Sequence, residues 1–185
     1  MDDNQIVALF YARSEQAIVE LSNKYGKLCI SIAHNILNDT QDAEECVNDA
    51  YLGAWNSIPP HKPNPLSTYI CRIVRNLSIA KYHANSAQKR NSQYDVALDE
   101  LENCLSSPAT VESALSAREL PRLLDRFLDS LDVHSRVIFV RRYWYGDSIQ
   151  DIAAKCRLRS NTVSVQLSRT RDKLRKFLSK EGYIL

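Results

Sequence analysis

The sequence has little glycine and little proline, four and six residues of 185, which excludes a low-complexity chain. It has no run of 18 apolar residues, and this excludes a membrane-spanning helix. Its first residues, Met1 to Asn4, are acidic where a secretory signal would be basic, so we expect a cytoplasmic protein without membrane insertion. Hydrophobic residues make up 44% of the chain, which suits one ordinary globular domain or two small ones.

The sequence also lacks closely spaced cysteine pairs and the sequence motifs of common enzyme classes. The four histidines lie far apart, and no P-loop, G-x-G-x-x-G or G-x-S-x-G motif occurs. No two cysteines have the C-x-x-C spacing of a zinc or thioredoxin-like site. We therefore expect no metal, no cofactor and no enzymatic activity, and thiols that are buried or incidental, with redox sensing or metal binding as the alternative. The cysteines are Cys29, Cys46, Cys71, Cys104 and Cys156.

Strand-type alternation never reaches six residues, whereas helical periodicity covers most of the chain. Residues 58–65 hold four prolines and must form a loop. Asp39 or Thr40, Ser67 or Thr68, and Asp132 are the expected helix caps. Pro121 predicts a kink or a helix boundary. The expected helices cover residues 4–12, 15–37, 41–56, 67–84, 110–131 and 133–145.

Residues 84–108 lose the helical pattern and are rich in Ser, Asn, Gln and acidic side chains. We expect a linker there, with one helical turn over residues 95–101. The sequence thus predicts an all-α fold, two small helical domains joined by a flexible linker. The expected domains are residues 1–88 and 108–185, with the linker over 89–107.

Charge is segregated along the chain although the net charge is only +2. Residues 1–50 carry nine acidic and three basic side chains, whereas residues 51–92 carry six basic ones and no acid. Residues 93–131 are again acidic, and residues 132–185 hold twelve Lys or Arg against five Asp or Glu. Charges that only solvate helix faces need no such segregation. Two basic blocks therefore favour two places where a phosphate backbone binds.

Residues 148–178 have the pattern of a helix-turn-helix. Ser148 is an expected N-cap with Asp151 three positions later, a weak form of the capping box. A break over residues 157–160 leads to a second expected cap at Ser160 and then to a long helix. At about 100° per residue, one side of that helix is mostly apolar. That side holds Val163, Leu167, Thr170, Leu174, Phe177 and Leu178.

The opposite side of this last helix is polar and basic. Burial of the apolar side turns it outward, where a recognition helix meets the major groove of DNA. DNA binding is therefore expected. The outward side holds Asn161, Ser164, Val165, Ser168, Arg169, Asp172, Arg175 and Lys176.

The helix expected over residues 67–84 is two-sided as well. Its apolar side holds Ile70, Ile73, Val74, Leu77, Ala80 and Ala84. A face with arginines and an amide but no acid suits phosphates and base edges, and the loop before it could present backbone to an unstacked base. That face holds Thr68, Arg72, Arg75, Asn76, Ile79 and His83.

The order of these features resembles the bacterial sigma-70 family of RNA polymerase initiation factors, in its small extracytoplasmic-function (ECF) type. The residues that carry the resemblance in the first half are 42–51 (DAEECVNDAY), Trp55 and 69–76 (YICRIVRN). In the second half they are 131–140, 148–153 (SIQDIA) and 161–171. The helix-turn-helix alone is only moderately specific, whereas the two blocks in this order are highly specific.

The resemblance implies a role for each part. The acidic helix would dock on the clamp helices of the polymerase β′ subunit through Asp42, Glu45, Asp49 and Trp55. The β flap is a further implied contact on the polymerase core. ECF factors are commonly sequestered by an anti-sigma protein, so such a partner is left open for this chain.

The resemblance also assigns the DNA contacts. The loop would hold flipped bases of the −10 promoter element, and the helix after it would contact the strand through Thr68, Arg72, Arg75 and Asn76. The recognition helix would read the −35 element. Its expected reading residues are Asn161, Ser164, Val165, Ser168 and Arg169. The expected phosphate contacts are Arg157, Arg159, Lys173 and Arg175.

Two other classes of protein fit the sequence less well. A dimeric helix-turn-helix repressor or activator would bind a palindromic operator unaided, with half-sites about one helical turn apart. It would leave the first 90 residues without a role, and the chain has no sustained heptad seam. An enzyme would need the catalytic signatures that are missing.

Overall fold

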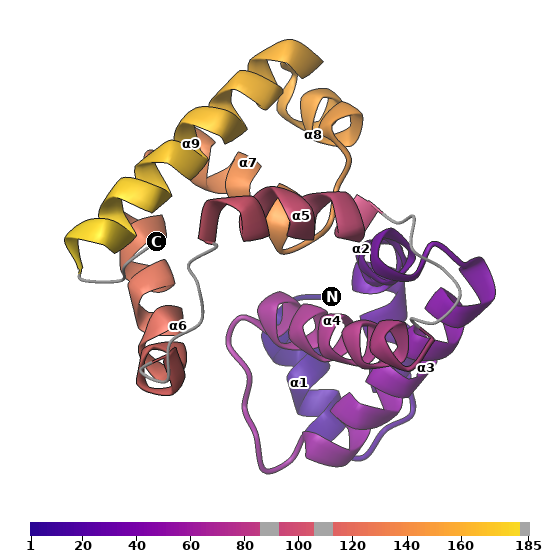
Figure 1. Cartoon of the computed structure of the whole chain (residues 1–185). Helices are drawn as coiled ribbons and strands as arrows, with labels where there is room; N and C mark the ends of the chain where they lie inside the picture. Colours follow the sequence, from indigo (N-terminus) through magenta and orange to yellow (C-terminus); the bar gives the residue numbers. More distant parts are fainter. Residues whose placement is uncertain (86–92, 106–112, 182–185) are drawn as a thin grey trace. The chain divides into compact units, whose positions relative to one another are not determined.

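The structure is a computed structural model that describes residues 1–85, 93–105 and 113–181 (Figure 1). The described residues are helical and include no strand, which confirms the all-α prediction. The chain divides into two compact units, Met1–Asp95 (unit 1) and Val96–Leu185 (unit 2).

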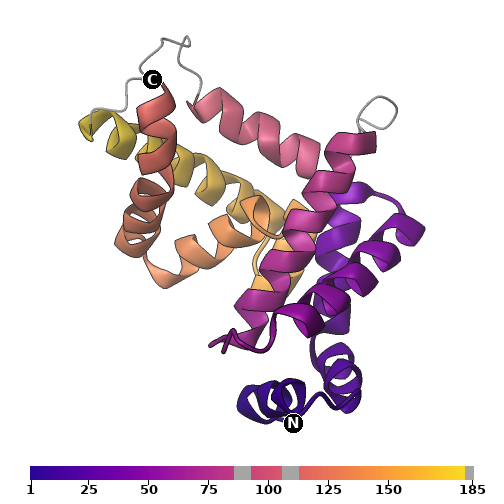
Figure 2. The same ribbon diagram turned by 90° about the horizontal axis from the view of Figure 1, so that it is seen from below.

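Unit 1 is built from α1 (Asp3–Tyr11), α2 (Gln16–Leu37), α3 (Thr40–Ser57) and α4 (Leu66–Asn85). Helices α2, α3 and α4 pack against one another, and α1 packs against α2 and α4. In Figure 2, α3 and α4 run side by side, and α1, in indigo, lies across one end of the unit. Each of the four helices begins and ends within one residue of its predicted limits.

The core of unit 1 is apolar, because every helix turns one apolar stripe inward. Large side chains such as Phe10, Leu21 and Ile36 are fully buried there. Alanines at positions 43, 50 and 54 of α3 let the neighbouring helices approach closely. Gly26 of α2 serves the same purpose, since a Cβ there would lie only 3.3 Å from the hydroxyl oxygen of Tyr51.

Unit 2 contains most of α5 (Gln93–Leu105), followed by α6 (Ser113–Ser130), α7 (Val133–Tyr143), α8 (Ile149–Cys156) and α9 (Ser160–Lys180). Helix α5 crosses the sequence boundary between the units, which falls after Asp95. Phe127, Phe139 and Phe177 form an aromatic cluster in the core, with ring centroids 5.7–5.9 Å apart in the two pairs that share Phe127. The predicted inner side of α9 is confirmed: five of its six residues are buried, and Phe177 packs against the core.

Three predicted caps are confirmed, and two are wrong. The carboxylates of Asp39 and Asp132 accept backbone N–H groups at the starts of α3 and α7, and Ser148 Oγ does so at α8. Ser160 is not a cap: α9 begins one residue earlier than that cap requires, because the carbonyl of Arg159 already accepts the Val163 N–H.

The prediction that α4 is opened by Ser67 or Thr68 is also wrong. Leu66 is its first residue, because the Leu66 N–H donates to the carboxylate of Asp3, 3.2 Å away. That cap comes from a residue 63 positions away along the chain, so local sequence could not indicate it. The buried side of α4 is shifted as well: Cys71 and Ser78 are buried, whereas Ala80 and Ala84 are exposed.

The predicted linker is helical over much of its length. Helix α5 covers residues 93–105, where a single turn was expected, because Ala97 and Leu101 pack into the core of unit 2. Pro121 lies inside α6 and ends no helix, so the boundary alternative is wrong and a kink at Pro121 stays a prediction. Helix α7 ends at Tyr143, two residues before its predicted end. The remaining linker residues 89–92 and 106–107, and the predicted helix start at residue 110, lie outside the described residues.

Candidate polymerase and nucleic-acid interfaces

Helices α8 and α9 of unit 2 form a helix-turn-helix (Figure 1). Ser148 fixes the start of α8: its Oγ accepts the Asp151 N–H at 3.1 Å and donates to the Asp151 carboxylate at 2.6 Å. The turn begins at Arg157, which ends α8 with φ 56°, in the left-handed region. The Leu158 N–H then donates to the Ala153 carbonyl at 2.9 Å, which closes the helix end and redirects the chain.

Most predicted reading residues of α9 reach solvent. The side chains of Asn161, Val165, Ser168 and Arg169 are exposed. Ser164 is half-buried, and its hydroxyl donates to the Ser160 carbonyl at 3.1 Å. A helix that buries one side and exposes polar and basic groups on the other can enter a DNA groove.

A shallow groove lies along this exposed part of α9 and adds residues that the sequence reasoning missed. Thr162 and Gln166 line it together with Ser135 of α7. Gln166 Nε2 donates to Ser135 Oγ at 3.1 Å and so connects α9 to the N-terminal turn of α7. Gln166 follows Val165, a predicted reading residue, in the sequence, and this is the indication that the sequence offers for the place of Gln166 in the groove.

The four predicted phosphate contacts are all exposed: Arg157, Arg159, Lys173 and Arg175. The first two belong to the turn of the helix-turn-helix, and the others to α9. Arg175 also lies 3.5 Å from the Asp172 carboxylate, with both side chains at least half exposed. Such a surface ion pair contributes little and can give way to a phosphate.

A polar network fixes α5, α7 and α9 to one another inside unit 2. The Glu100 carboxylate of α5 accepts Arg142 Nη2 at 2.8 Å, the Tyr143 hydroxyl at 2.9 Å and Arg171 Nη1 at 3.1 Å. The Arg142 side chain is only 1% exposed, so its charge needs this partner. Burial, with Glu100 adding to it, raises the pKa of Tyr143, which therefore keeps its proton.

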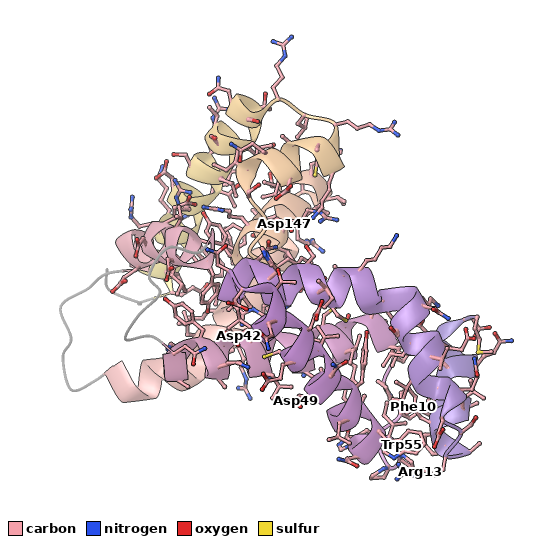
Figure 3. The ribbon with its side chains drawn as sticks, turned by 90° about the vertical axis from the view of Figure 1, so that its right-hand side faces the viewer. Phe10, Arg13, Asp42, Asp49, Trp55 and Asp147 are labelled. Atoms are coloured by element: carbon pink, nitrogen blue, oxygen red, sulfur yellow. The ribbon has the colours of Figure 1, made fainter. Side chains whose placement is uncertain are left out.

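Asp147, labelled in Figure 3, holds the segment before α8. Its buried carboxylate binds Arg141 of α7 and Lys155 of α8, each at 2.9 Å. Arg142 Nη1 also donates to the Asp147 carbonyl at 3.1 Å. These bonds fix the angle between α7 and the helix-turn-helix.

Helix α7 exposes an apolar stripe that the sequence analysis did not single out. Val133, Val137 and Trp144 are 71%, 42% and 40% exposed, and Val140 between them is half-buried. Their spacing of four, three and four residues puts them on one side of the helix. Contiguous exposed apolar groups of this kind are typical of protein-binding surfaces.

In unit 1 the predicted docking acids lie on α3, and Figure 3 labels two of them, Asp42 and Asp49. Lys81 of α4 pairs with Asp42 at 3.2 Å and with Glu45 at 2.7 Å, so these two acids are partly engaged. The Asn85 amide also donates to Asp42, at 3.2 Å. Asp49 is exposed, and it is the acid that a basic partner would reach most readily.

Trp55, the fourth predicted docking residue, is half-buried at the C-terminal end of α3. Its ring lies 6.2 Å from the ring of Phe10, and the Arg13 guanidinium lies 5.4 Å from its centroid. Figure 3 shows the three side chains gathered at one end of the unit. Trp55 thus anchors α1, and only the rest of its surface is open to a partner.

The predicted −10 face of α4 is exposed at Thr68, Arg72 and Asn76. Arg75 differs: it is half-buried, with its guanidinium 5.9 Å from the ring centroid of Tyr94 at the start of α5. Burial lowers the pKa of Arg75, although the side chain stays charged. DNA contact by Arg75 stays a prediction, and it would require this side chain to leave the Tyr94 ring.

The cysteines whose side chains are described lie mostly in the interior. Cys29, Cys46 and Cys71 are buried free thiols, and Cys156 is half-buried. Burial raises the pKa of Cys46, which keeps the thiol protonated and unreactive. In the described ranges no three metal-binding side chains gather at one place, and no helix there is long and apolar enough to cross a membrane.

Comparison with known proteins gives the family of this chain. Residues 21–88 match the family Sigma-70 region 2, and residues 122–174 match Sigma-70 region 4. The chain is 21% identical to the ECF RNA polymerase sigma factor SigE of Mycolicibacterium smegmatis, over 98% of this chain and 70% of that protein. A solved structure of CnrH in complex with the cytosolic domain of CnrY aligns over 96% of this chain and 97% of that one, with 21% identity and a TM-score of 0.45. The two family matches together span well over half of the sequence, so the chain belongs to the sigma-70 family of RNA polymerase sigma factors, in its ECF group.

Proposed function

We propose that this chain is a promoter-specificity subunit that binds bacterial RNA polymerase core in the cytoplasm, reads −35 and −10 elements and assists promoter melting. The observation that carries the proposal is the two-sided helix α9, which buries Val163 and Leu167 and exposes Ser168 and Arg169. An initiation subunit of this kind needs no catalytic group of its own, because the polymerase supplies the chemistry.

Unit 2 would read the −35 element in the major groove. Arg169 has the length and the donors for a bidentate contact with guanine. Asn161 suits adenine, and Val165 suits a thymine methyl group. Arg157, Arg159, Lys173 and Arg175 would bind phosphates on either side and set the register of the helix.

Unit 1 would bind the −10 element as the duplex opens. Thr68, Arg72 and Asn76 are the exposed contacts on α4, and Arg75 would join them after leaving Tyr94. The exposed middle of loop 58–65, including His61 and Asn64, would receive an unstacked base.

Core polymerase would bind at two surfaces of the chain. Asp49 would contact basic residues of the β′ clamp helices beside Trp55. Asp42 and Glu45 would join it once Lys81 releases them. The apolar stripe of α7 (Val133, Val137, Val140 and Trp144) suits the β flap, since an apolar helix face needs an apolar partner. An anti-sigma partner stays a prediction from the family resemblance.

Transcription in vitro tests the proposal. Purified chain, bacterial core polymerase and fragmented DNA from the source organism are combined, with each protein omitted in turn. Discrete transcripts that require both proteins support the proposal, and their start sites give the −35 and −10 sequences. Absence of transcripts, together with tight binding of a palindrome by the chain alone, would favour a dimeric repressor instead.

A further inference from the structure

Three side chains from the N-terminal segment of unit 1 contact loop 58–65 or the helix ends that flank it. Arg13 Nη1 donates to the Trp55 carbonyl at 2.6 Å, in the last turn of α3. The Tyr11 hydroxyl donates to the Pro60 carbonyl at 2.9 Å, inside the loop. The Asp3 carboxylate accepts the Leu66 N–H at 3.2 Å, in the first turn of α4. One short segment therefore holds the loop where it leaves α3 and where it enters α4.

Two of these contacts bind backbone groups that a helix leaves without hydrogen-bond partners at its ends, the Trp55 carbonyl and the Leu66 N–H. The last carbonyls of α3 and the first N–H groups of α4 have no partner within their own helices. A carboxylate at a helix N-terminus and a guanidinium at a helix C-terminus also match the polarity of the helix dipoles. Asp3 and Arg13 thus suit the positions that they occupy, by charge as well as by distance.

Two of the three contacting side chains, those of Asp3 and Arg13, are themselves held by neighbouring groups. Lys24 Nζ and the Tyr25 hydroxyl donate to the Asp3 carboxylate at 2.7 and 2.5 Å. Arg13 has φ 52°, a left-handed conformation that is costly for a residue with a Cβ. Its N–H donates to the Phe10 carbonyl at 3.1 Å, and its guanidinium lies over Trp55. A strained backbone of this kind persists where the surrounding contacts require it.

The loop is fixed at its ends and open in its middle. Ile58 and Leu66 are fully buried, and the Tyr69 hydroxyl donates to Ser57 Oγ at 2.7 Å. His61, Lys62 and Asn64 are exposed between these anchors. The exposed residues can therefore meet a ligand without the loop having to order itself first, which reduces the entropic cost of binding.

We propose that Asp3, Tyr11 and Arg13 are positioning residues for promoter opening, which hold loop 58–65 in the shape that receives an unstacked −10 base. This inference rests on the proposed function of unit 1. It assigns to α1 and the residues after it a part in base selection, although none of the three side chains needs to touch DNA.

The test is base discrimination by the holoenzyme. The DNA templates carry the promoter recovered with the wild-type protein, and mismatches already open its −10 segment. The templates come in pairs that differ at one base of the non-template strand. We expect Tyr11→Phe and Arg13→Ala to lower the transcription ratio between preferred and substituted base by about three- to tenfold, the range for one hydrogen bond. Because both templates meet the same protein sample, a smaller folded fraction leaves this ratio unchanged.

Tyr51→Phe is the matched control. It also removes a hydroxyl from the interior of unit 1, where Tyr51 interacts with Ser22 of α2 and not with the loop. Wild-type ratios in both loop variants would overturn the inference and leave the proposed function standing. An equal loss in Tyr51→Phe would overturn it too, since the effect would then be general. If the wild-type chain gives no core-dependent transcripts, the proposed function fails and the inference fails with it.

Hydrogen–deuterium exchange of the free chain gives a second readout that needs no promoter. Tyr11→Phe and Asp3→Ala should speed exchange over residues 58–66, because each removes a contact that restricts this segment. Tyr51→Phe should leave exchange there as in the wild type. Unchanged exchange in both loop variants would contradict a positioning role.

Discussion

The two units present their candidate DNA-reading groups in different ways. In unit 2 the groups lie on one helix, α9, and the burial of Val163, Leu167 and Leu174 turns them outward. In unit 1 they include a loop that, together with its flanking helix ends, is contacted by side chains 42 to 63 positions away along the chain. The first surface follows from helical periodicity, and the second follows from tertiary contacts.

This difference affects what a substitution should do in each unit. A reading residue of α9 can be exchanged without disturbing its neighbours, because the helix is held from its other side. The loop of unit 1 can be altered by residues that never meet DNA. Each unit carries one of the two tryptophans, Trp55 in unit 1 and Trp144 in unit 2, so fluorescence of single-tryptophan variants reports on each unit separately.

The largest effect should come from Glu100→Ala, which tests whether unit 2 depends on tertiary polar contacts as well. The substitution leaves the buried Arg142 charge without its carboxylate, and Tyr143 and Arg171 lose the same partner. We expect the free energy of unfolding of unit 2 to fall by about 3 kcal/mol, at the low end for a buried pair because Glu100 is 23% exposed. Urea unfolding followed by Trp144 fluorescence in a Trp55→Phe background measures it.

Asp99→Ala is the control for that experiment, since Asp99 is an exposed acid on the same helix. It should change the unfolding midpoint of unit 2 little. If Glu100→Ala and Asp99→Ala behave alike, the network contributes nothing to stability, and α5 would be only loosely attached to unit 2.

Arg169→Ala should weaken −35 binding without changing stability. Loss of a bidentate contact costs about 1–3 kcal/mol, and the loss should be confined to promoters that carry the contacted base. Footprinting of the holoenzyme on wild-type and base-substituted promoters measures both effects. Lys180→Ala, at the far end of α9, serves as the control. A footprint unchanged by Arg169→Ala would remove Arg169 from the reading set.

Asp49→Lys should weaken core binding about tenfold, or about 1.4 kcal/mol, since a like charge would then face basic partner residues. The unfolding of unit 1, followed by Trp55 fluorescence, should stay the same, because Asp49 is exposed. Asp125→Lys on α6 makes the same charge change in the other unit. Co-purification with core polymerase that is unaffected by Asp49→Lys would argue against α3 as the docking helix.

The parts of the fold that could be predicted are those fixed by local chemistry. Helix limits in unit 1 followed from periodicity, and the caps at Asp39, Asp132 and Ser148 followed from side chains next to the helix start. The group that caps α4 could not be predicted, because it is Asp3, which lies far away along the chain. Helix α5 was missed as a full helix for a similar reason, since its stability comes from burying Ala97 and Leu101 and from the bonds to Glu100.

The residues of the candidate sites also divide into those that local sequence could indicate and those whose surroundings depend on tertiary contacts. Helical periodicity predicted the exposed residues of α9, because the side of the helix on which a residue lies follows from its position along the helix. It could not give the engagement of Arg75 with Tyr94, or of Asp42 with Lys81, because both partners lie on other helices. Nor could it indicate the contacts of Tyr11 and Arg13, which join segments more than forty residues apart.

The smallest expected effect concerns the pH dependence of Asp3, and it tests whether the distant cap of α4 contributes to unit 1 stability. Partial burial acts to raise the pKa of Asp3, but hydrogen bonds from Lys24 and Tyr25 outweigh it and lower the pKa below its ordinary value of 3.8. The stabilisation from ionised Asp3 is therefore present above pH 3.8 and is lost as the pH falls through the lower, folded-state pKa.

The unfolding free energy of Asp3→Asn should lie about 0.5–1 kcal/mol below that of the wild type at neutral pH, a figure reduced for solvent screening. Unfolding followed by Trp55 fluorescence in a Trp144→Phe background should show this difference shrinking below about pH 4. The control is Glu15→Gln, at an exposed position whose side chain makes no cap hydrogen bond, and it should show no such trend. A difference that stays constant with pH would mean that the charge of Asp3 is not what holds the start of α4.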